Sequence, residues 1–152
     1  MIATLSKQSV REYTKDDPVR PHIPADWRIE NGREVYALYE DQYAEEAPVD
    51  FEGARAVICV AYTNGVAYNE KYMDEMTENA NTAMFYTVWS YDKGAGREIV
   101  LKVANHIKET RPDISRFVTL SPLTEMAERF HLRNGAMFLD KYTDCQNFEY
   151  HI

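Results

Sequence analysis

The chain has 152 residues, 45% of them hydrophobic, which is enough to bury a core of two packed layers, and we expect a single domain over residues 1–152. Its 17 basic and 25 acidic residues give a net charge of −8, which argues against a general nucleic-acid-binding protein. No segment is apolar over a length that crosses a membrane, and residues 1–11 lack the apolar core of a signal peptide.

The first half of the chain predicts two strands and a short helix. Residues 1–30 are expected to form an extended segment, since three prolines between residues 18 and 24 forbid a continuous helix there. Residues 33–40 predict a strand, and an acidic loop follows at residues 41–53. Residues 54–63 are apolar on both faces and predict a central strand. Residues 68–79 predict a short amphipathic helix whose acidic face is solvated.

The centre of the chain, residues 82–122, predicts a strand, a glycine turn, a helix and a second strand. The first strand covers residues 83–90 and the helix covers 97–109, where Ile99, Val100, Val103 and Ile107 form one apolar stripe. The second strand covers residues 117–120. A unit of this size predicts a right-handed crossover between parallel strands.

The turn of this crossover is a predicted phosphate site. Backbone N–H groups of Lys93, Gly94, Ala95 and Gly96 lie at the start of the helix, where unpaired donors and the positive end of the helix dipole meet.

The last third predicts one helix and two strands. Ser121 is expected to cap a helix that begins at Pro122, with Leu123, Met126, Ala127 and Phe130 as its buried stripe. Residues 136–140 and 146–152 predict the final strands. The expected fold class is therefore α/β (α+β), with a mixed, mostly antiparallel sheet, a central parallel crossover and helices on both faces.

These residues carry a resemblance to a known family. The order of elements, followed by a helix with Ala-x-x-Phe-His-x-x-x-Gly, resembles the GNAT superfamily of acyl-CoA-binding enzymes, and within it the catalytic domain of malonyl-CoA decarboxylase. Three segments carry the closer similarity: residues 82–87 (TAMFYT), 117–122 (FVTLSP) and 130–136 (FHLRNGA). Residues 56–66 (AVICVAYTNGV) resemble the family's upstream strand more loosely.

The resemblance implies an acyl-CoA thioester as substrate and a set of site residues. It places His131 and Thr87 in the catalytic roles, His131 to deliver a proton and Thr87 as a strand hydroxyl where the decarboxylases have serine. It adds Arg97, Ser121 and Thr124 to the CoA-binding loop residues. The chain departs from the family at Tyr91, where GNAT loops usually carry Gln or Arg, and at His131, where acetyltransferases usually carry tyrosine.

Structural explanations of the same residues stay open. Thr87 is also an ordinary β-branched strand residue, His131 an ordinary buried histidine, and Ser121 a helix cap. The four histidines and the two cysteines, Cys59 and Cys145, show no metal-ligand spacing, so no metal site is expected and the thiols are read as reduced, in a cytoplasmic protein.

Three functions follow as alternatives. The first is decarboxylation of a malonyl thioester, the second is transfer of an acyl group to an amine, for which the acidic loop would attract a cationic acceptor, and the third is CoA binding without catalysis. The acyl group is expected on CoA or on a carrier-bound pantetheine. No nucleic-acid or membrane partner is expected, and a homo-oligomer stays open.

Overall fold

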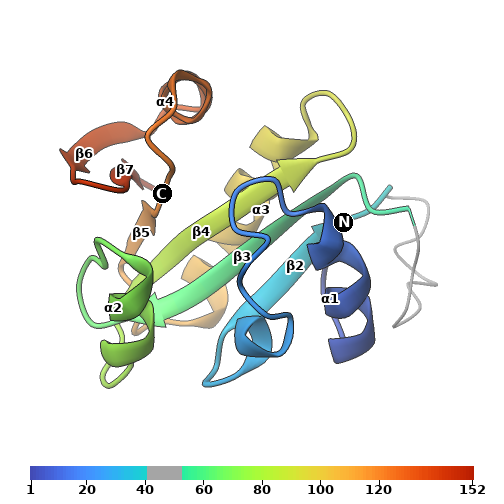
Figure 1. Cartoon of the computed structure of the whole chain (residues 1–152), viewed down its shortest axis with the longest axis horizontal. Coiled ribbons are helices and arrows are strands. Elements are labelled where there is room, and N and C mark those ends of the chain that lie inside the picture. The colour runs from blue at the N-terminus through green and yellow to red at the C-terminus, as the bar shows by residue number, and fades with distance from the viewer. Residues whose placement is uncertain (41–52) are drawn as a thin grey trace. The chain divides into compact units, whose positions relative to one another are not determined.

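The computed structural model describes residues 1–40 and 53–152, so residues 41–52 of the predicted acidic loop lie outside the described residues. Seven strands form one sheet in the order β1-β2-β3-β4-β5-β7-β6 (Figure 1). The pair β4 and β5 is parallel, whereas β1–β2, β2–β3, β5–β7 and β6–β7 are antiparallel. The mixed, mostly antiparallel sheet with one parallel crossover is therefore confirmed.

The chain divides into two compact units. Unit 1 contains residues 1–60 and 87–103, and unit 2 contains residues 61–86 and 104–152. The predicted organisation as one domain stays a prediction.

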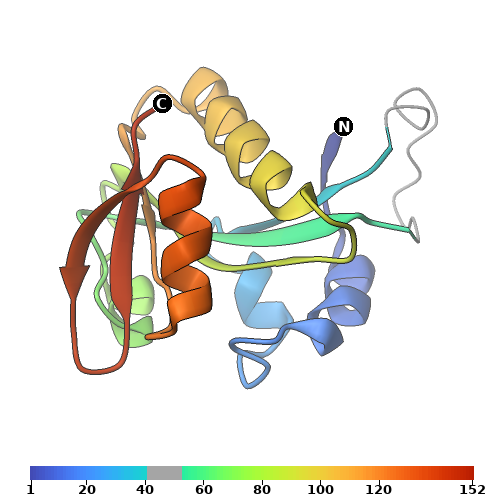
Figure 2. The same cartoon turned by 90° about the horizontal axis from the view of Figure 1, so that it is seen from above.

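Unit 1 is built on β1 (Ile2–Thr4), β2 (Glu34–Leu38) and the start of β3 (Ala56–Thr63). All eight residues of β3 are buried, as expected for a strand that is apolar on both faces. Helix α1 (Lys7–Tyr13) and the first half of α3 (Ala95–Thr110) lie on opposite faces of these strands in Figure 2. Ile99, Val100 and Val103 of α3 are fully buried, and so is Ile107 in unit 2, which confirms the apolar stripe.

The prediction of an extended segment at residues 1–30 is wrong. Besides β1 and α1, this segment contains the short 3-10 helices Thr14–Asp16 and Asp26–Ile29. The prolines do exclude a long helix, but single turns fit between them. Arg28 fixes these turns: it is fully buried, pairs with Asp17 at 2.7 Å, and donates to the Arg20 and Ile23 carbonyl oxygens at 2.7 and 3.2 Å.

Unit 2 contains the parallel pair. The first four residues of β4 (Thr82–Ser90) align with all of β5 (Arg116–Thr119), from Thr82 opposite Arg116 to Phe85 opposite Thr119. The N–H of Leu120 then donates to the Phe85 carbonyl at 2.9 Å, and Ser121 already bridges to Gln146 of β7 (Gln146–Tyr150). The chain therefore leaves β4 for β7 directly after Leu120.

The remaining elements of unit 2 are α2 (Glu70–Glu75), α4 (Glu125–Arg133) and β6 (Met137–Lys141). Helix α2 is shorter than the predicted 68–79, since Asn69 caps its start and Met76 ends it. The predicted start of the last helix is wrong. Thr124, not Ser121, is the N-cap of α4, and its hydroxyl accepts from the Ala127 N–H at 3.2 Å.

The predicted buried stripe of α4 is also wrong in phase. Leu123 precedes the helix and Met126 is exposed, whereas His131 and Asn134 are buried. The late start places residues 127, 131 and 134 on the inner face of α4, at helical spacing.

Candidate functional site

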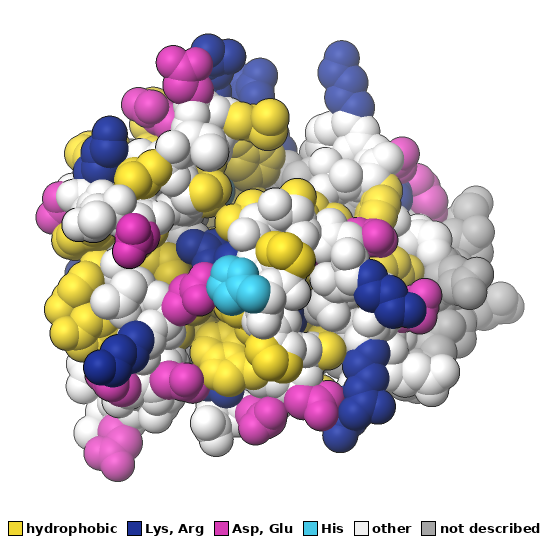
Figure 3. Space-filling view, in the orientation of Figure 1, with side chains coloured by type: hydrophobic (Ala, Val, Ile, Leu, Met, Phe, Trp, Pro, Cys, Tyr) yellow, Lys and Arg dark blue, Asp and Glu magenta, His cyan; other side chains and the backbone are white. Residues whose placement is uncertain are grey.

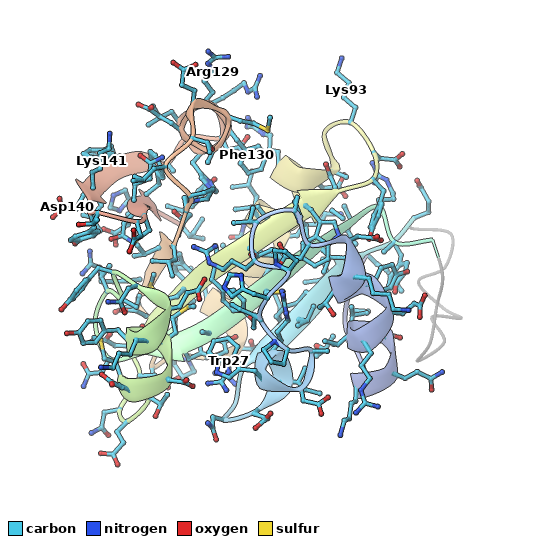
Figure 4. All side chains as sticks on the ribbon, viewed as in Figure 1. Trp27, Lys93, Arg129, Phe130, Asp140 and Lys141 are labelled. Carbon is cyan, nitrogen blue, oxygen red and sulfur yellow. The ribbon has the colours of Figure 1, made fainter. Side chains whose placement is uncertain are left out.

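The predicted phosphate loop lies at the end of β4 in unit 1. Its turn is closed by the Ala95 N–H, which donates to the Asp92 carbonyl at 3.2 Å. Gly94 has a φ of +82°, a conformation that favours glycine, and a Cβ built there would meet nothing within 4 Å. Lys93 and Gly94 are exposed, whereas Ala95 and Gly96 are buried in the first turn of α3. Figure 4 shows the Lys93 side chain projecting away from the loop.

Tyr91 occupies the position where GNAT loops usually carry Gln or Arg. Its side chain connects the loop to the N-terminal segment. Its hydroxyl donates to Asp16 at 2.7 Å and accepts from the Trp89 indole N–H at 3.0 Å. Burial raises the pKa of Tyr91 to about 12, and its bond to Asp16 acts in the same direction. Tyr91 therefore has a structural role that accounts for its position.

Arg55 is a cation beside this loop that the sequence reasoning missed. It lies 3.1 Å from Asp92 and 3.4 Å from Glu98, and its carbonyl accepts from the Tyr91 N–H at 2.8 Å. The pKa of Glu98 is lowered, chiefly by its hydrogen bond to Lys102. Arg55 and Lys102 thus offset the acidic groups at the start of α3, where a phosphate would otherwise be repelled. The position of Arg55 before an apolar strand gave no signal of this contact.

Thr87 lies on β4 in unit 1 and is buried. Its hydroxyl has no hydrogen-bond partner among the described residues. A buried hydroxyl without a partner costs free energy, so such a group in a folded protein is a candidate for contact with a ligand.

His131 lies on the inner face of α4 in unit 2 and contacts β7. Its Nδ1 is 2.7 Å from the hydroxyl of Tyr150 on β7, and its ring stacks on Phe148 at 5.4 Å between centroids. Burial lowers the pKa of His131 to about 4. The imidazole is therefore neutral at pH 7. Tyr150 is a further candidate that the sequence reasoning missed, because only the pairing of β7 with β5 brings it under α4.

Ser121 and Thr124 have structural partners in unit 2. The Ser121 hydroxyl lies 2.7 Å from that of Thr119, which also accepts from the Phe148 N–H at 3.1 Å, and Thr124 caps α4. Their roles in CoA binding stay predictions, as does that of Arg97, which is exposed on the first turn of α3.

The predicted site residues thus fall into two groups. Thr87 and the loop from Lys93 to Arg97 belong to unit 1, whereas Ser121, Thr124 and His131 belong to unit 2. In residues 1–40 and 53–152 no three His, Cys, Asp or Glu side chains are arranged to hold a metal ion. None of the helices in these two ranges combines the length and the apolar character needed to cross a membrane.

No protein-family model matches the chain, and no curated protein matches it. Solved structures do share its fold. Malonyl-CoA decarboxylase from Agrobacterium vitis has a TM-score of 0.63 at 16% identity, over 86% of this chain and 35% of that one. Ribosomal-protein-alanine N-acetyltransferase from Brucella melitensis has a TM-score of 0.60 at 8% identity, over 100% and 99% of the two chains. An acetyltransferase from Bacillus subtilis in complex with CoA has a TM-score of 0.58 at 10% identity, over 97% and 93%.

Identities this low establish the fold alone, which is the fold of GNAT acetyltransferases and of the malonyl-CoA decarboxylases. The chain spans about a third of the length of the decarboxylase structures, between 32% and 35%.

Proposed function

We propose that this chain binds an acyl-CoA thioester and decarboxylates a malonyl group on it. The observation that carries the proposal is the buried, neutral His131 held by Tyr150, because His131 belongs to the segment FHLRNGA that resembles the decarboxylase motif. The shared fold with malonyl-CoA decarboxylase structures supports the same assignment.

The reaction requires a stabilised enolate. The bond between the carboxylate carbon and the α-carbon breaks, carbon dioxide leaves, and the electron pair moves to the thioester carbonyl oxygen. Donors aimed at this oxygen lower the barrier. A proton from water then completes the acetyl group.

His131 fits the role of a hydrogen-bond donor to the enolate oxygen better than that of a general acid that transfers a proton. If the Tyr150 hydroxyl donates to Nδ1, the ring proton is on Nε2, and a neutral imidazole donates it as a hydrogen bond to the enolate oxygen. With a pKa of about 4 the ring holds no extra proton at pH 7. The Thr87 hydroxyl, buried in unit 1 without a hydrogen-bond partner among the described residues, is a separate candidate for contact with the ligand.

CoA is proposed to bind with its pyrophosphate at the start of α3. The first N–H groups of a helix have no acceptor within it, and Gly96 presents no side chain there. The Ala95 N–H already donates to Asp92, so Gly96 carries more of this contact than the sequence suggested. The solved acetyltransferase complex with CoA supports the assignment of the ligand.

Malonyl-CoA turnover, followed by mass as acetyl-CoA and carbon dioxide, tests the proposal. Removing one such donor costs about a hundredfold to a thousandfold in rate, so His131→Ala should lower turnover by that factor, and Thr87→Val by less. His106→Ala, an exposed histidine on α3, is the matched control and should leave the rate unchanged. Turnover of both site variants within a few-fold of the parent would exclude the mechanism.

CoA binding is measured separately by calorimetry. Gly96→Glu should weaken it, because it adds bulk and a negative charge at the first turn of α3. An unchanged dissociation constant for Gly96→Glu would remove the loop assignment.

A second candidate is transfer of an acyl group to an amine. The observation that favours it is the extent of the fold match, because the similarity covers 100% of this chain and 99% of the Brucella acetyltransferase, and 97% of this chain and 93% of the Bacillus one. Incubation with acetyl-CoA and mixed amines separates the two reactions. Free thiol released only in the presence of an amine would establish the transferase, and CoA binding without turnover would leave a non-catalytic CoA-binding protein.

A further inference from the structure

Asn134, at the end of α4, carries a buried amide group whose donor is not used within the described part of the chain. The residue is 8% exposed, and its Nδ2 is buried without a hydrogen-bond partner in residues 1–40 and 53–152. A buried donor without an acceptor costs free energy, so folded proteins rarely contain one without a reason. Asn134 belongs to unit 2, as His131 does.

The way in which α4 ends does not account for this side chain. Asparagine is common at helix ends because it tolerates a left-handed backbone, but Asn134 is right-handed, with a φ of −79°. The left-handed residue is Gly135, with a φ of +96°. The backbone N–H of Asn134 donates to the Phe130 carbonyl at 3.1 Å, so the backbone is held without the side-chain amide.

Asn147 of β7 shows how a structural asparagine is held in the same unit. It is fully buried, and its Nδ2 donates to the carbonyl oxygens of Thr119 and Ala67 at 2.7 and 3.3 Å. These two bonds connect β7 with β5 and with the segment before α2. The Nδ2 of Asn134 makes no such bond to the residues that the structure describes. Its burial therefore fits contact with a ligand better than a structural role.

His131 supplies a second donor on the same face of α4. Residues 131 and 134 are three positions apart, and the helical φ of Asn134 continues this spacing, so their Cβ atoms lie about 5 to 6 Å apart. Tyr150 occupies Nδ1 of His131, which leaves Nε2 for a ligand. Both side chains are buried, and Figure 3 shows no histidine at the upper left, where Figure 1 draws α4 and β6. One face of α4 thus carries two buried nitrogen groups, one turn apart.

Two neutral N–H donors suit an oxygen that gains negative charge. The amide Nδ2 of asparagine is a donor only. In the proposed reaction, the electron pair of the broken carbon–carbon bond moves to the thioester carbonyl oxygen, and donors fixed in advance at this oxygen stabilise the charge. We infer that Asn134 is a further catalytic residue, whose Nδ2 donates to the thioester carbonyl oxygen on the same face of α4 as His131. The catalytic role rests on the proposed function, whereas the contact requires only a bound acyl thioester.

Replacement of Asn134 by leucine separates contact with the substrate from a structural role. Leucine has a similar branched shape and no donor, so Asn134→Leu should lower kcat for malonyl-CoA about a hundredfold and leave KM nearly unchanged. Its midpoint in urea should equal that of the parent or exceed it, because the lost donor has no partner among the described residues.

Asn147→Leu is the matched control for stability. It removes two hydrogen bonds to carbonyl groups, so its midpoint in urea should fall. If Asn134→Leu keeps the kcat of the parent, or if its midpoint falls as far as that of Asn147→Leu, the inference is wrong.

NMR spectra of the parent test the contact without relying on decarboxylation. Acetyl-CoA contains the thioester carbonyl and CoA does not, so acetyl-CoA should move the side-chain NH2 signals of Asn134 downfield relative to CoA. The NH2 signals of Asn147 should not differ between the two ligands, because this amide already donates to protein carbonyls. Identical Asn134 signals with acetyl-CoA and CoA would overturn the inference.

The failure of this inference and the failure of the proposed function give different results. A parent that releases no carbon dioxide from malonyl-CoA, but shows the Asn134 shift with acetyl-CoA, would exclude decarboxylation and support Asn134 as a contact to the thioester. A parent that decarboxylates malonyl-CoA, with the same kcat in Asn134→Leu, would exclude the role of Asn134 alone.

Discussion

The Nδ1 atom of His131 lies 2.7 Å from the hydroxyl oxygen of Tyr150, and both side chains are buried. This contact joins α4 to β7 and fixes which ring nitrogen is left for a ligand. It also explains how a histidine is tolerated on the inner face of α4, because a buried polar ring needs a partner.

Removal of the Tyr150 hydroxyl should affect both stability and turnover. Tyr150→Phe leaves Nδ1 buried without a partner, which costs about 1 to 3 kcal/mol in urea denaturation. Turnover should fall as well, since the tautomer is no longer fixed. Tyr142→Phe is the control, because the contact from the Tyr142 hydroxyl to Asp140 is long, at 3.4 Å, and lies on the surface. Equal effects of the two variants would contradict the role of Tyr150.

The stability of the protein should depend on pH through His131. Burial lowers its pKa in the folded state from 6.5 to about 4, so between these values the unfolded chain binds more protons. The contribution of His131 to the free energy of unfolding is fully present above pH 6.5 and is lost as the pH falls towards 4. Between pH 6.5 and 5 the loss is about 2 kcal/mol.

Denaturation of the parent and of His131→Gln at both pH values isolates this effect. The other histidines and the carboxylates titrate in both proteins, so their contributions cancel in the difference. A difference in the free energy of unfolding that does not change with pH would show that His131 titrates normally in the folded protein.

The buried pair of Arg28 and Asp17 should be a strong determinant of stability. Asp17→Asn keeps the acceptor for the Val19 and Arg20 N–H groups but leaves the Arg28 charge buried without compensation. We expect a loss of about 3 to 5 kcal/mol in the free energy of unfolding. Asp26→Asn, which removes an exposed ion pair with Arg11, should cost less than about 1 kcal/mol. Similar losses for the two variants would contradict the burial of Arg28.

Gly94 should be sensitive to substitution through its backbone alone. Its φ is +82° and an added Cβ meets nothing, so Gly94→Ala should cost about 1 to 2 kcal/mol, and Gly94→Asn less. Thermal melting of the two variants measures this difference. If alanine is tolerated as well as asparagine, the turn does not hold this conformation in solution.

The sequence by itself determined the elements whose signal is local. The apolar run of β3 and the stripe of α3 from Ile99 to Ile107 required no knowledge of neighbours, since the period of the pattern specifies the element. The parallel pairing of β4 with β5 followed from the intervening helix, because a helical connection returns the chain to the end of the sheet at which the first strand began.

Only the tertiary structure decided what depends on contacts distant in the chain. The predicted inner face of α4 contained Met126, whereas in the structure, where α4 begins at Glu125, it contains His131. The partner that the buried imidazole needs is Tyr150, 19 positions later in the chain. The lowered pKa of His131 follows from that burial and has no signature in the motif itself. The burial of Arg28 likewise depends on the tertiary structure. A charged residue is expected to be exposed from its sequence, but in the fold Arg28 is surrounded by Asp17 and two carbonyl groups. The local sequence pattern does not specify these partners, and without them a charge is not buried.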